Sequence, residues 1–549
     1  MNKTFISVAI AAIAAATYSV DAEACTNLIA GKGATTDGSV MVTYSADSHS
    51  LYGMLHHAKA GKHAKGEMRR ITEWDTGKYL GEIPEAEETY NVVGNMNEHQ
   101  LVIAESTWGG HKELEDTTGN SIMDYGSLIY VTLERAKTAR EAIKIMTDLV
   151  EKYGYASSGE SFSIADKNEV WVLEMIAKGA EKGAVWIAVR IPDNAISGHA
   201  NEPRIRQIDL KDKENVIYAK DMITFARKRG YFSGKDADFS FADAYEVHSP
   251  STRRGCDARV WSYFRRFNKD ADRYYAWCNG DSNEPMPLYI IPDRKVSLAE
   301  METSMRDHFE GTPFEMTSDV GAGSYKVPYR WRPMEYEVEG KKYCMERAIA
   351  TQQTGWSFVS QTRSWLPDQV GGVIWFGTDD TNTTVYMPFY CGMTEVPREV
   401  QPGDINTFSI ESNFWVNNIV ANQAYYRYDQ MIGDIRRVQS GLEKGYIDSR
   451  AQVEAELVKL VEAGDMAGYR AKVNKEGADI ARGATEAYLE LAKYLFVKCM
   501  DGNLKKTDEN GNFIKSEYGL PVYPSFPGYD KKYYENIVKE SGDHFLIKE

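Results

Sequence analysis

A cysteine placed directly after a removable leader constrains this chain more than any other sequence feature. Lys3 gives the start a positive charge, residues 5–16 (FISVAIAAIAAA) are apolar, and residues 22–24 (AEA) fit the small-x-small cleavage pattern. The apolar run is too short to cross a bilayer, which takes about 20 residues. The sequence therefore predicts a signal peptide over residues 1–24 and a mature chain that begins at Cys25.

A cysteine at a chain terminus combines a thiol and a free α-amino group, with ordinary pKa values of about 8.5 and about 7.7–8.0. The thiolate is a strong nucleophile, and a neighbouring amine can accept its proton. The leading hypothesis is a hydrolase whose active site forms when the leader is removed. Two alternatives remain: Cys25 is the lipid-modified cysteine of a lipoprotein, which would consume both groups, or it is an ordinary buried or disulfide-bonded cysteine.

Composition restricts the class of protein. After loss of the leader the chain is still long enough for two or more domains. The full sequence is 43% hydrophobic, which indicates a folded globular protein. Its formal net charge of −16 does not favour nucleic acid or anionic membranes as partners. No later segment is long and uncharged enough to span a membrane, so we expect an exported protein in the periplasm or outside the cell.

Metal and cofactor sites are not expected. His49, His56, His57 and His63 lie together in a Gly/Lys-rich stretch, but no HExxH motif accompanies them. No phosphate-binding loop and no GxSxG elbow occurs. The cysteines form no CxxC pair, and Cys256 and Cys278 are the pair expected to form a disulfide if one exists.

The first residues of the mature chain predict a hairpin. Residues 26–30 and 40–44 read as strands, and Asp37-Gly38 between them is a turn signal. The returning strand brings Asp47 close to Cys25, where a carboxylate could orient the amine or receive a substrate ammonium. The alternative is that Asp47 only ends the strand.

Three blocks of sequence together carry a family resemblance. They are Cys25-Thr26 with Gly31, Ala34, Asp37-Gly38-Ser39 and Asp47; residues 94–107 (GNMNEHQLVIAEST); and residues 197–205 (SGHANEPRI). In this order they resemble the N-terminal-nucleophile cysteine dipeptidases, a family related to penicillin V acylase and bile salt hydrolase. The resemblance implies that Cys25 is the nucleophile and that Asp47 binds near it.

The resemblance also implies roles for residues further along the chain. Asn201 matches an asparagine whose side-chain amide contributes to the oxyanion hole; otherwise it caps a turn before Pro203. Thr107 falls roughly where the acylases carry a second asparagine donor, or is a plain strand residue. Apart from the resemblance, a dipeptide ammonium needs a carboxylate to bind it, and Glu105 is a second candidate for this role beside Asp47. Many relatives carry arginine three residues before Asp47, where this chain has Tyr44.

The fold class expected is α+β. The patterns predict a helix over residues 134–153 and strands over 161–165, 169–175 and 184–190. The resemblance implies the four-layer αββα sandwich of the N-terminal-nucleophile (Ntn) hydrolases, with residues 25–400 as the catalytic domain.

Residues 401–549 are expected to be a helical portion that packs on this core. The elements predicted there are helices at 414–439, 449–462 and 477–500 and a tail of loops around one short helix. Just before this portion, residues 371–388 are predicted to form two strands about a turn at 378–382.

These observations predict an exported cysteine dipeptidase that cleaves dipeptides through a Cys25 thioester and requires no cofactor. One alternative is an amidase of the same kind that acts on an N-acyl amino acid, a bile salt or a penicillin-type side chain. Another is a lipid-anchored binding protein without enzymatic activity.

Overall fold

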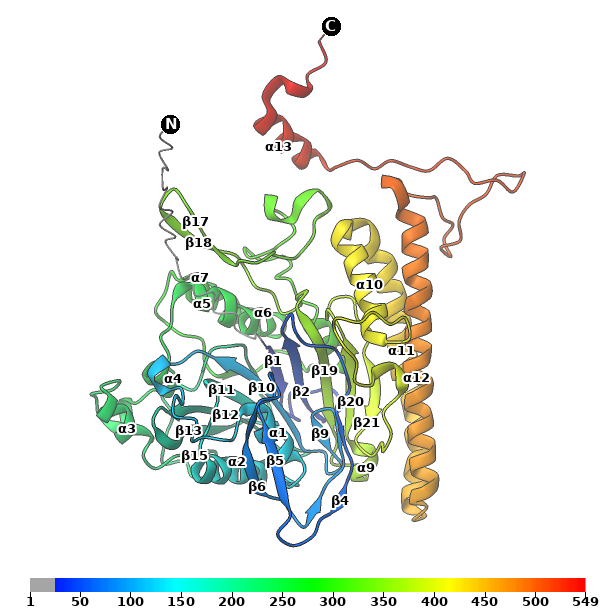
Figure 1. Ribbon diagram of the computed structural model, residues 1–549. Helices are drawn as coiled ribbons and strands as arrows, with labels where there is room; N and C mark the ends of the chain where they lie inside the picture. The colour runs from blue at the N-terminus through cyan, green and yellow to red at the C-terminus, as the bar shows by residue number, and fades with distance from the viewer. Residues whose placement is uncertain (1–24, 549) are drawn as a thin grey trace, which may run out of the picture.

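The computed structural model describes residues 25–548, and the predicted signal peptide over residues 1–24 lies outside them. Two large antiparallel sheets and a set of long C-terminal helices make up most of the described chain (Figure 1). The protein is therefore of mixed α+β class, as the sequence predicted.

Cys25 lies next to the first strand of a seven-stranded sheet. The strand order is β16-β14-β1-β2-β19-β20-β21. The bounds are β1 (Asn27–Ala30), β2 (Val40–Asp47), β14 (Ile196–His199), β16 (Tyr289–Ile290), β19 (Thr354–Thr362), β20 (Val373–Thr378) and β21 (Met387–Tyr390). The predicted hairpin is confirmed, because β1 and β2 pair antiparallel with Ile29 opposite Val42. Strand β1 also pairs with β14, so it is held on both sides.

The other large sheet has eight strands in the order β15-β13-β12-β11-β10-β9-β8-β3. The bounds are β3 (His57–Ala58), β8 (Val92–Val93), β9 (Met96–Asn97), β10 (Val102–Trp108), β11 (Gly159–Ala165), β12 (Val170–Lys178), β13 (Glu181–Ile191) and β15 (Val216–Tyr218). The strands predicted at 161–165, 169–175 and 184–190 correspond to β11, β12 and β13 and are confirmed.

Side chains of the eight-stranded sheet alternate between two cores. On β10, Val102 and Ala104 belong to the core shared with the seven-stranded sheet, while Ile103, like Leu101 just before the strand, belongs to a second core. Successive strand residues point to opposite faces, so this sheet is buried on both sides. Strands β1 and β2 contact β10, which places the two sheets face to face.

Two helices cover the outer face of the eight-stranded sheet. They are α1 (Tyr125–Leu133) and α2 (Ala139–Tyr153), and their buried residues complete the second core. The predicted helix at 134–153 starts too early, since Glu134 ends α1 and Thr138 caps α2. The side chain of Thr138 accepts the Glu141 N–H, a first-turn bond that fixes where α2 begins.

Three long helices lie beside β20 and β21 and form the right side of the molecule in Figure 1. They are α10 (Asn413–Tyr426), α11 (Tyr428–Glu462) and α12 (Met466–Cys499). The prediction of a single helix over 414–439 was wrong, because the chain breaks at Arg427, whose guanidinium donates to the Cys499 carbonyl at the end of α12.

The predicted gap between residues 439 and 449 was also wrong. Gly441 and Gly445 lower helix propensity there, but both face open space within α11. The helix is held by tertiary contacts, since buried Glu443 pairs with Arg306 and accepts the Tyr386 N–H. Packing therefore outweighs the local preference.

The remaining elements are short. The helices are α3 (Met222–Arg229), α4 (Phe241–Tyr245), α5 (Pro250–Thr252), α6 (Ala258–Phe267), α7 (Tyr275–Asn279), α8 (Leu298–Ser304), α9 (Asp368–Gly371) and α13 (Lys531–Ser541). Paired strands are β4 (Gly61–Lys62) with β7 (Glu88–Thr89), β5 (Met68–Thr72) with β6 (Tyr79–Pro84), and β17 (Glu335–Val338) with β18 (Lys341–Cys344). The tail carries α13, away from the main body in Figure 1.

The structure contradicts the expected Cys256–Cys278 disulfide. All six cysteines are free thiols. Cys256 lies in a π-helical turn before α6 and Cys278 lies in α7, two elements that pack through other residues. Within residues 25–548, no helix has the length and apolar character that crossing a bilayer requires.

Candidate active site around Cys25

Cys25 is buried just before the N-terminal end of β1, an interior strand of the seven-stranded sheet, with 4% of its surface exposed. The next residue, Thr26, already exchanges backbone hydrogen bonds with Ser45 of β2. The Cys25 carbonyl oxygen accepts a hydrogen bond of 2.9 Å from Nη1 of Arg259. Backbone and side-chain bonds therefore fix the carbonyl side of this cysteine.

The Cys25 thiol faces two polar side chains. Its Sγ lies 3.3 Å from Glu105 Oε1 and 3.6 Å from the Tyr44 hydroxyl, and the Tyr44 hydroxyl itself donates to Glu105. Burial, and then the charges of Glu105 and Asp47, raise the pKa of the thiol well above its ordinary value. The Asp47 backbone N–H and the Tyr44 hydroxyl act in the opposite direction. In the unprocessed chain the sulfur is therefore a protonated thiol at neutral pH.

Asp47 lies close to Cys25, but its carboxylate points toward an arginine. Oδ2 accepts a hydrogen bond of 2.9 Å from Arg347, and Oδ1 accepts one of 2.7 Å from Thr354. Burial raises the pKa of Asp47, and Arg347 and Thr354 partly oppose that shift. The carboxylate is thus held in an ion pair, while the backbone N–H of Asp47 faces the thiol.

Tyr44 brings no positive charge to the site, and the positive charges there come from distant parts of the chain. Tyr44 packs edge-on against Trp356, with ring centroids 4.9 Å apart. Two buried guanidinium groups, those of Arg259 and Arg347, reach the site instead. The sequence offered one signal for Arg259: it stands at helical spacing with the buried aromatics Tyr263 and Phe267 on α6.

Asn201 is positioned by its backbone and by Arg259. Its φ of 58° is a left-handed conformation that asparagine adopts more readily than most residues. The side-chain Nδ2 donates to the Thr107 carbonyl at 2.6 Å, and Oδ1 accepts from Arg259 Nη2 at 2.8 Å. With Oδ1 bound to a cation, the amide nitrogen is turned away from Arg259 and toward β10.

His199, two residues before Asn201, is buried between the sheets. Its ring nitrogens lie 2.6 Å from Ser106 Oγ and 2.8 Å from Ser163 Oγ. Burial lowers the pKa of this histidine to about 3, with a further contribution from Arg204. Ser106 Oγ also accepts the Asn201 N–H, so a neutral imidazole supports the backbone of Asn201.

Thr107 does not take the place of a second side-chain donor at the thiol. Its hydroxyl donates to Glu160 Oε2 at 3.1 Å, and its carbonyl binds Asn201. Glu105 does lie at the thiol. The structure therefore brings Cys25, Asp47, Glu105 and Asn201 together, with Thr107 as a neighbour that supports Asn201 through its backbone.

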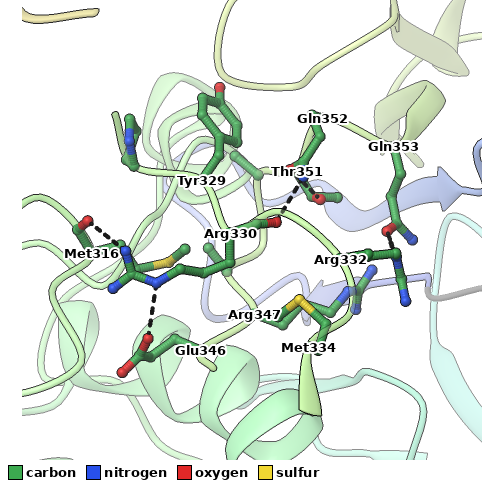
Figure 2. A pocket seen from close by; sticks show the side chains of 13 residues that line it. Met316, Tyr329, Arg330, Arg332, Met334, Glu346, Arg347, Thr351, Gln352 and Gln353 are labelled. Atoms are coloured by element: carbon green, nitrogen blue, oxygen red, sulfur yellow. Dashed lines mark hydrogen bonds and ion pairs between the residues drawn. The ribbon is translucent and has the colours of Figure 1, made fainter. Parts of the chain in front are cut away.

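A small pocket (Figure 2) is lined by two residues, Arg347 and Gln353, that also bond to Asp47. It is lined in part by Arg332, Arg347 and Gln353, and its volume of about 10 Å³ matches one water molecule. Gln353 accepts from Arg332 and donates to the Asp47 carbonyl at 3.1 Å. A row of polar groups thus connects the pocket to the backbone beside Cys25.

The histidines considered as metal ligands lie in separate surroundings. His56 packs against Tyr130, His57 bonds to Asn91, and His63 lies within hydrogen-bonding distance of Thr89. Among the described residues, no group of three or more His, Cys, Asp or Glu side chains is arranged to hold a metal ion.

Comparison with protein-family models gives one match over most of the chain. The model described as peptidase family C69 matches residues 24–441. This range begins one residue before Cys25 and contains every candidate site residue discussed above.

Curated proteins similar to this chain include several dipeptidases. A probable dipeptidase of Salmonella dublin is 25% identical over 402 residues, 69% of this chain and 83% of that protein. A probable dipeptidase of Latilactobacillus sakei is 23% identical over 517 residues, 88% of this chain and 99% of that protein. A dipeptidase of Bifidobacterium longum is 27% identical over 304 residues, 53% of this chain and 52% of that protein.

Proposed function

Because the chain belongs to peptidase family C69 and is a dipeptidase of that family, we propose that removal of residues 1–24 creates its nucleophile at Cys25. The processed enzyme then hydrolyses dipeptides outside the cytoplasm, in the periplasm or the extracellular medium. The observation that carries this proposal is the position of Cys25: the first residue before the sheet, with its thiol among buried polar groups.

Cleavage after Ala24 would change the chemistry of Cys25, while the strand that follows is held by its pairing with β14 and β2. The peptide nitrogen becomes an amine on the same residue as the thiol. In the proposed reaction this amine accepts the thiol proton, and the thiolate attacks the dipeptide carbonyl carbon to form a C–S bond. The raised pKa of the thiol in the unprocessed chain fits a precursor that is inactive until the amine is released.

The tetrahedral intermediate carries a negative oxygen that needs hydrogen-bond donors. Asn201 is the proposed side-chain donor, since Arg259 holds its Oδ1 and thereby directs Nδ2. The ammonium of Cys25 returns its proton to the departing nitrogen as the C–N bond breaks. Water then hydrolyses the thioester, which releases the N-terminal amino acid of the dipeptide and restores the thiol.

The architecture supports an assignment to the Ntn-hydrolase fold. Two antiparallel sheets lie face to face, α1 and α2 cover one outer face, and α10–α12 pack beside the other sheet. We propose that this arrangement is the four-layer αββα sandwich, with residues 25–400 as the catalytic domain and residues 401–549 packed on it. A nucleophile at the start of a sheet strand fits that fold.

The proposal is tested with the full chain expressed with its leader. The intact mass of the purified protein should correspond to a chain that starts at an unmodified Cys25. A diacylglycerol adduct would support a lipid anchor instead, and an uncleaved leader on an active enzyme would refute the mechanism.

Activity is then compared on dipeptides, tripeptides and acyl amides. We expect hydrolysis of dipeptides, and we expect Cys25→Ala to abolish it while the far-UV circular dichroism spectrum stays unchanged. Turnover of acyl amides in preference to dipeptides would support an amidase of the same mechanism, and activity retained in Cys25→Ala would exclude this cysteine as the nucleophile.

A further inference from the structure

Two buried carboxyl groups lie together beside the Cys25 thiol. Glu105 on β10 and Glu160 on β11 are diagonal neighbours, because Glu105 is paired with Phe162 and Thr107 with Glu160. Their side chains point to the same face of the sheet. Glu105 is 1% exposed and Glu160 is 0% exposed, so both carboxyl groups are withdrawn from solvent.

The pair holds more acceptor atoms than the described residues satisfy. Glu105 Oε1 receives the Cys25 thiol and the Tyr44 hydroxyl, and Glu160 Oε2 receives the Thr107 hydroxyl. The other oxygen of each group, Glu105 Oε2 and Glu160 Oε1, has no donor among the described residues. Buried polar atoms are normally paired, so these two oxygens need a donor from elsewhere or a shared proton.

Burial and mutual repulsion affect the protonation of Glu105 and Glu160. Burial, and then the charge of Glu105, raise the pKa of Glu160 well above its ordinary value, so Glu160 keeps its proton at neutral pH. Burial also raises the pKa of Glu105, and a hydrogen bond from Glu160 partly opposes that shift. Two like charges in contact are unfavourable, so the pair carries at most one negative charge.

We propose that Glu105, supported by Glu160, receives the α-ammonium group of the dipeptide and thereby restricts the enzyme to peptides with a free amino terminus. This rests on the proposed dipeptidase function. An ammonium offers one positive charge and three N–H donors, and the Glu105 carboxylate can receive them, while the hydrogen bond from Glu160 holds that carboxylate in place. It is attached to the Cα next to the carbonyl carbon that the thiolate attacks, and the Glu105 carboxylate lies 3.3 Å from that sulfur.

Asp47, the other carboxylate near Cys25, is a poorer receptor for an ammonium. Its Oδ2 is in an ion pair with Arg347, and its Oδ1 accepts the Thr354 hydroxyl. A second cation at Asp47 would meet the charge of Arg347. The free-amine specificity is therefore assigned to Glu105 alone.

The test uses the processed enzyme and two substrates, L-alanyl-L-alanine and its N-acetyl derivative. We expect wild type to prefer the free dipeptide and Glu105→Gln to raise KM for it roughly 10- to 100-fold, the range for one charge-assisted hydrogen bond. The N-acetyl substrate, which has no charge at that end, should change little. Glu160→Gln keeps the charge of Glu105 and should have a smaller effect, and Glu87→Gln, on the exposed surface, is the matched control.

A second readout separates substrate binding from an effect on the nucleophile. Loss of the Glu105 charge removes one cause of the raised thiol pKa, so iodoacetamide should alkylate Cys25 in Glu105→Gln at least as fast as in wild type. Slower alkylation, together with an equal fall in kcat on both substrates, would make Glu105 the base for the thiol and overturn the proposal.

The proposal is also overturned if wild type cleaves both substrates equally well, or if Glu105→Gln leaves KM unchanged; both outcomes leave the dipeptidase function intact. Failure of wild type to cleave either substrate, or any other dipeptide, would instead refute the proposed function on which this inference depends.

Discussion

Replacing Arg259 by lysine tests whether a rigid guanidinium organises the candidate site. Arg259 is fully buried at the start of α6. Its hydrogen bonds reach the carbonyls of Cys25 and Ala200, Oδ1 of Asn201, the Thr26 hydroxyl and the Gly255 carbonyl. The same positive charge on lysine cannot reproduce this geometry, because an ammonium has three donors and no planar fork.

The number of bonds gives the size of the effect. Arg259 makes five hydrogen bonds, so at least two acceptors lose their donor in Arg259→Lys. A hydrogen bond to a charged group is worth about 1.5–3 kcal/mol, which predicts a loss of about 3–6 kcal/mol in the free energy of unfolding. If Asn201 loses its orientation, kcat should also fall by about 100-fold, the lower end of the range for one oxyanion donor.

The assay combines urea unfolding, followed by tryptophan fluorescence and by circular dichroism, with steady-state kinetics on a dipeptide. Arg265→Lys provides the matched control. Arg265 lies on the same helix but is partly exposed and pairs with Asp272, so its substitution should change stability by less than about 0.5 kcal/mol.

The kinetic result separates positioning from general destabilisation. A positioning role for Arg259 lowers kcat under conditions where the variant is fully folded and leaves KM nearly unchanged. If Arg259→Lys is folded, unfolds at the wild-type urea concentration and keeps kcat within about threefold of wild type, the argument from its five bonds is wrong.

The stability of the protein should respond to pH in opposite directions at two buried side chains, His199 and Glu174. His199 has a pKa of about 3 against an ordinary 6.5, so unfolding takes up a proton below pH 6.5 and stability falls by about 3 kcal/mol between pH 7 and pH 4. His199→Gln should lose this dependence in urea unfolding, and an equal acid loss in both proteins would contradict the assignment. Burial raises the pKa of Glu174 to about 7 from 4.5, so its stabilising contribution is present at low pH and lost as pH rises. Wild type should lose about 2–3 kcal/mol between pH 5 and pH 8 relative to Glu174→Gln, and parallel pH profiles for the two proteins would count against this shift.

The elements that the sequence predicted well are those with strong local signals. The Asp37-Gly38 turn fixed the β1–β2 hairpin, which in turn placed Asp47 beside Cys25. The alternating strands β11–β13 were identified because they are long and bounded by turns. Glu105 was a candidate because a dipeptide ammonium needs a carboxylate to bind it, and its contact with the thiol is a property of the folded chain.

The arginines of the site could not be placed from local patterns. Arg259 and Arg347 follow Cys25 by more than 200 residues, and no turn or periodicity links them to it. The prediction divided α11 between residues 439 and 449, a stretch whose glycines lower helix propensity, whereas its actual continuity comes from Glu443 and its partners. Contacts between distant segments decided each of these points.

The position of Cys25 next to a central strand also bears on how the proposed mature N-terminus would resist exopeptidases. An exopeptidase that trims the chain must draw successive residues into its own cleft. Thr26 and Asn27 are held by β2 and β14, and the Cys25 carbonyl by Arg259. Removal of residues beyond the cysteine would require β1 to separate from both of its neighbouring strands. The sheet therefore limits how far an exopeptidase can shorten the chain.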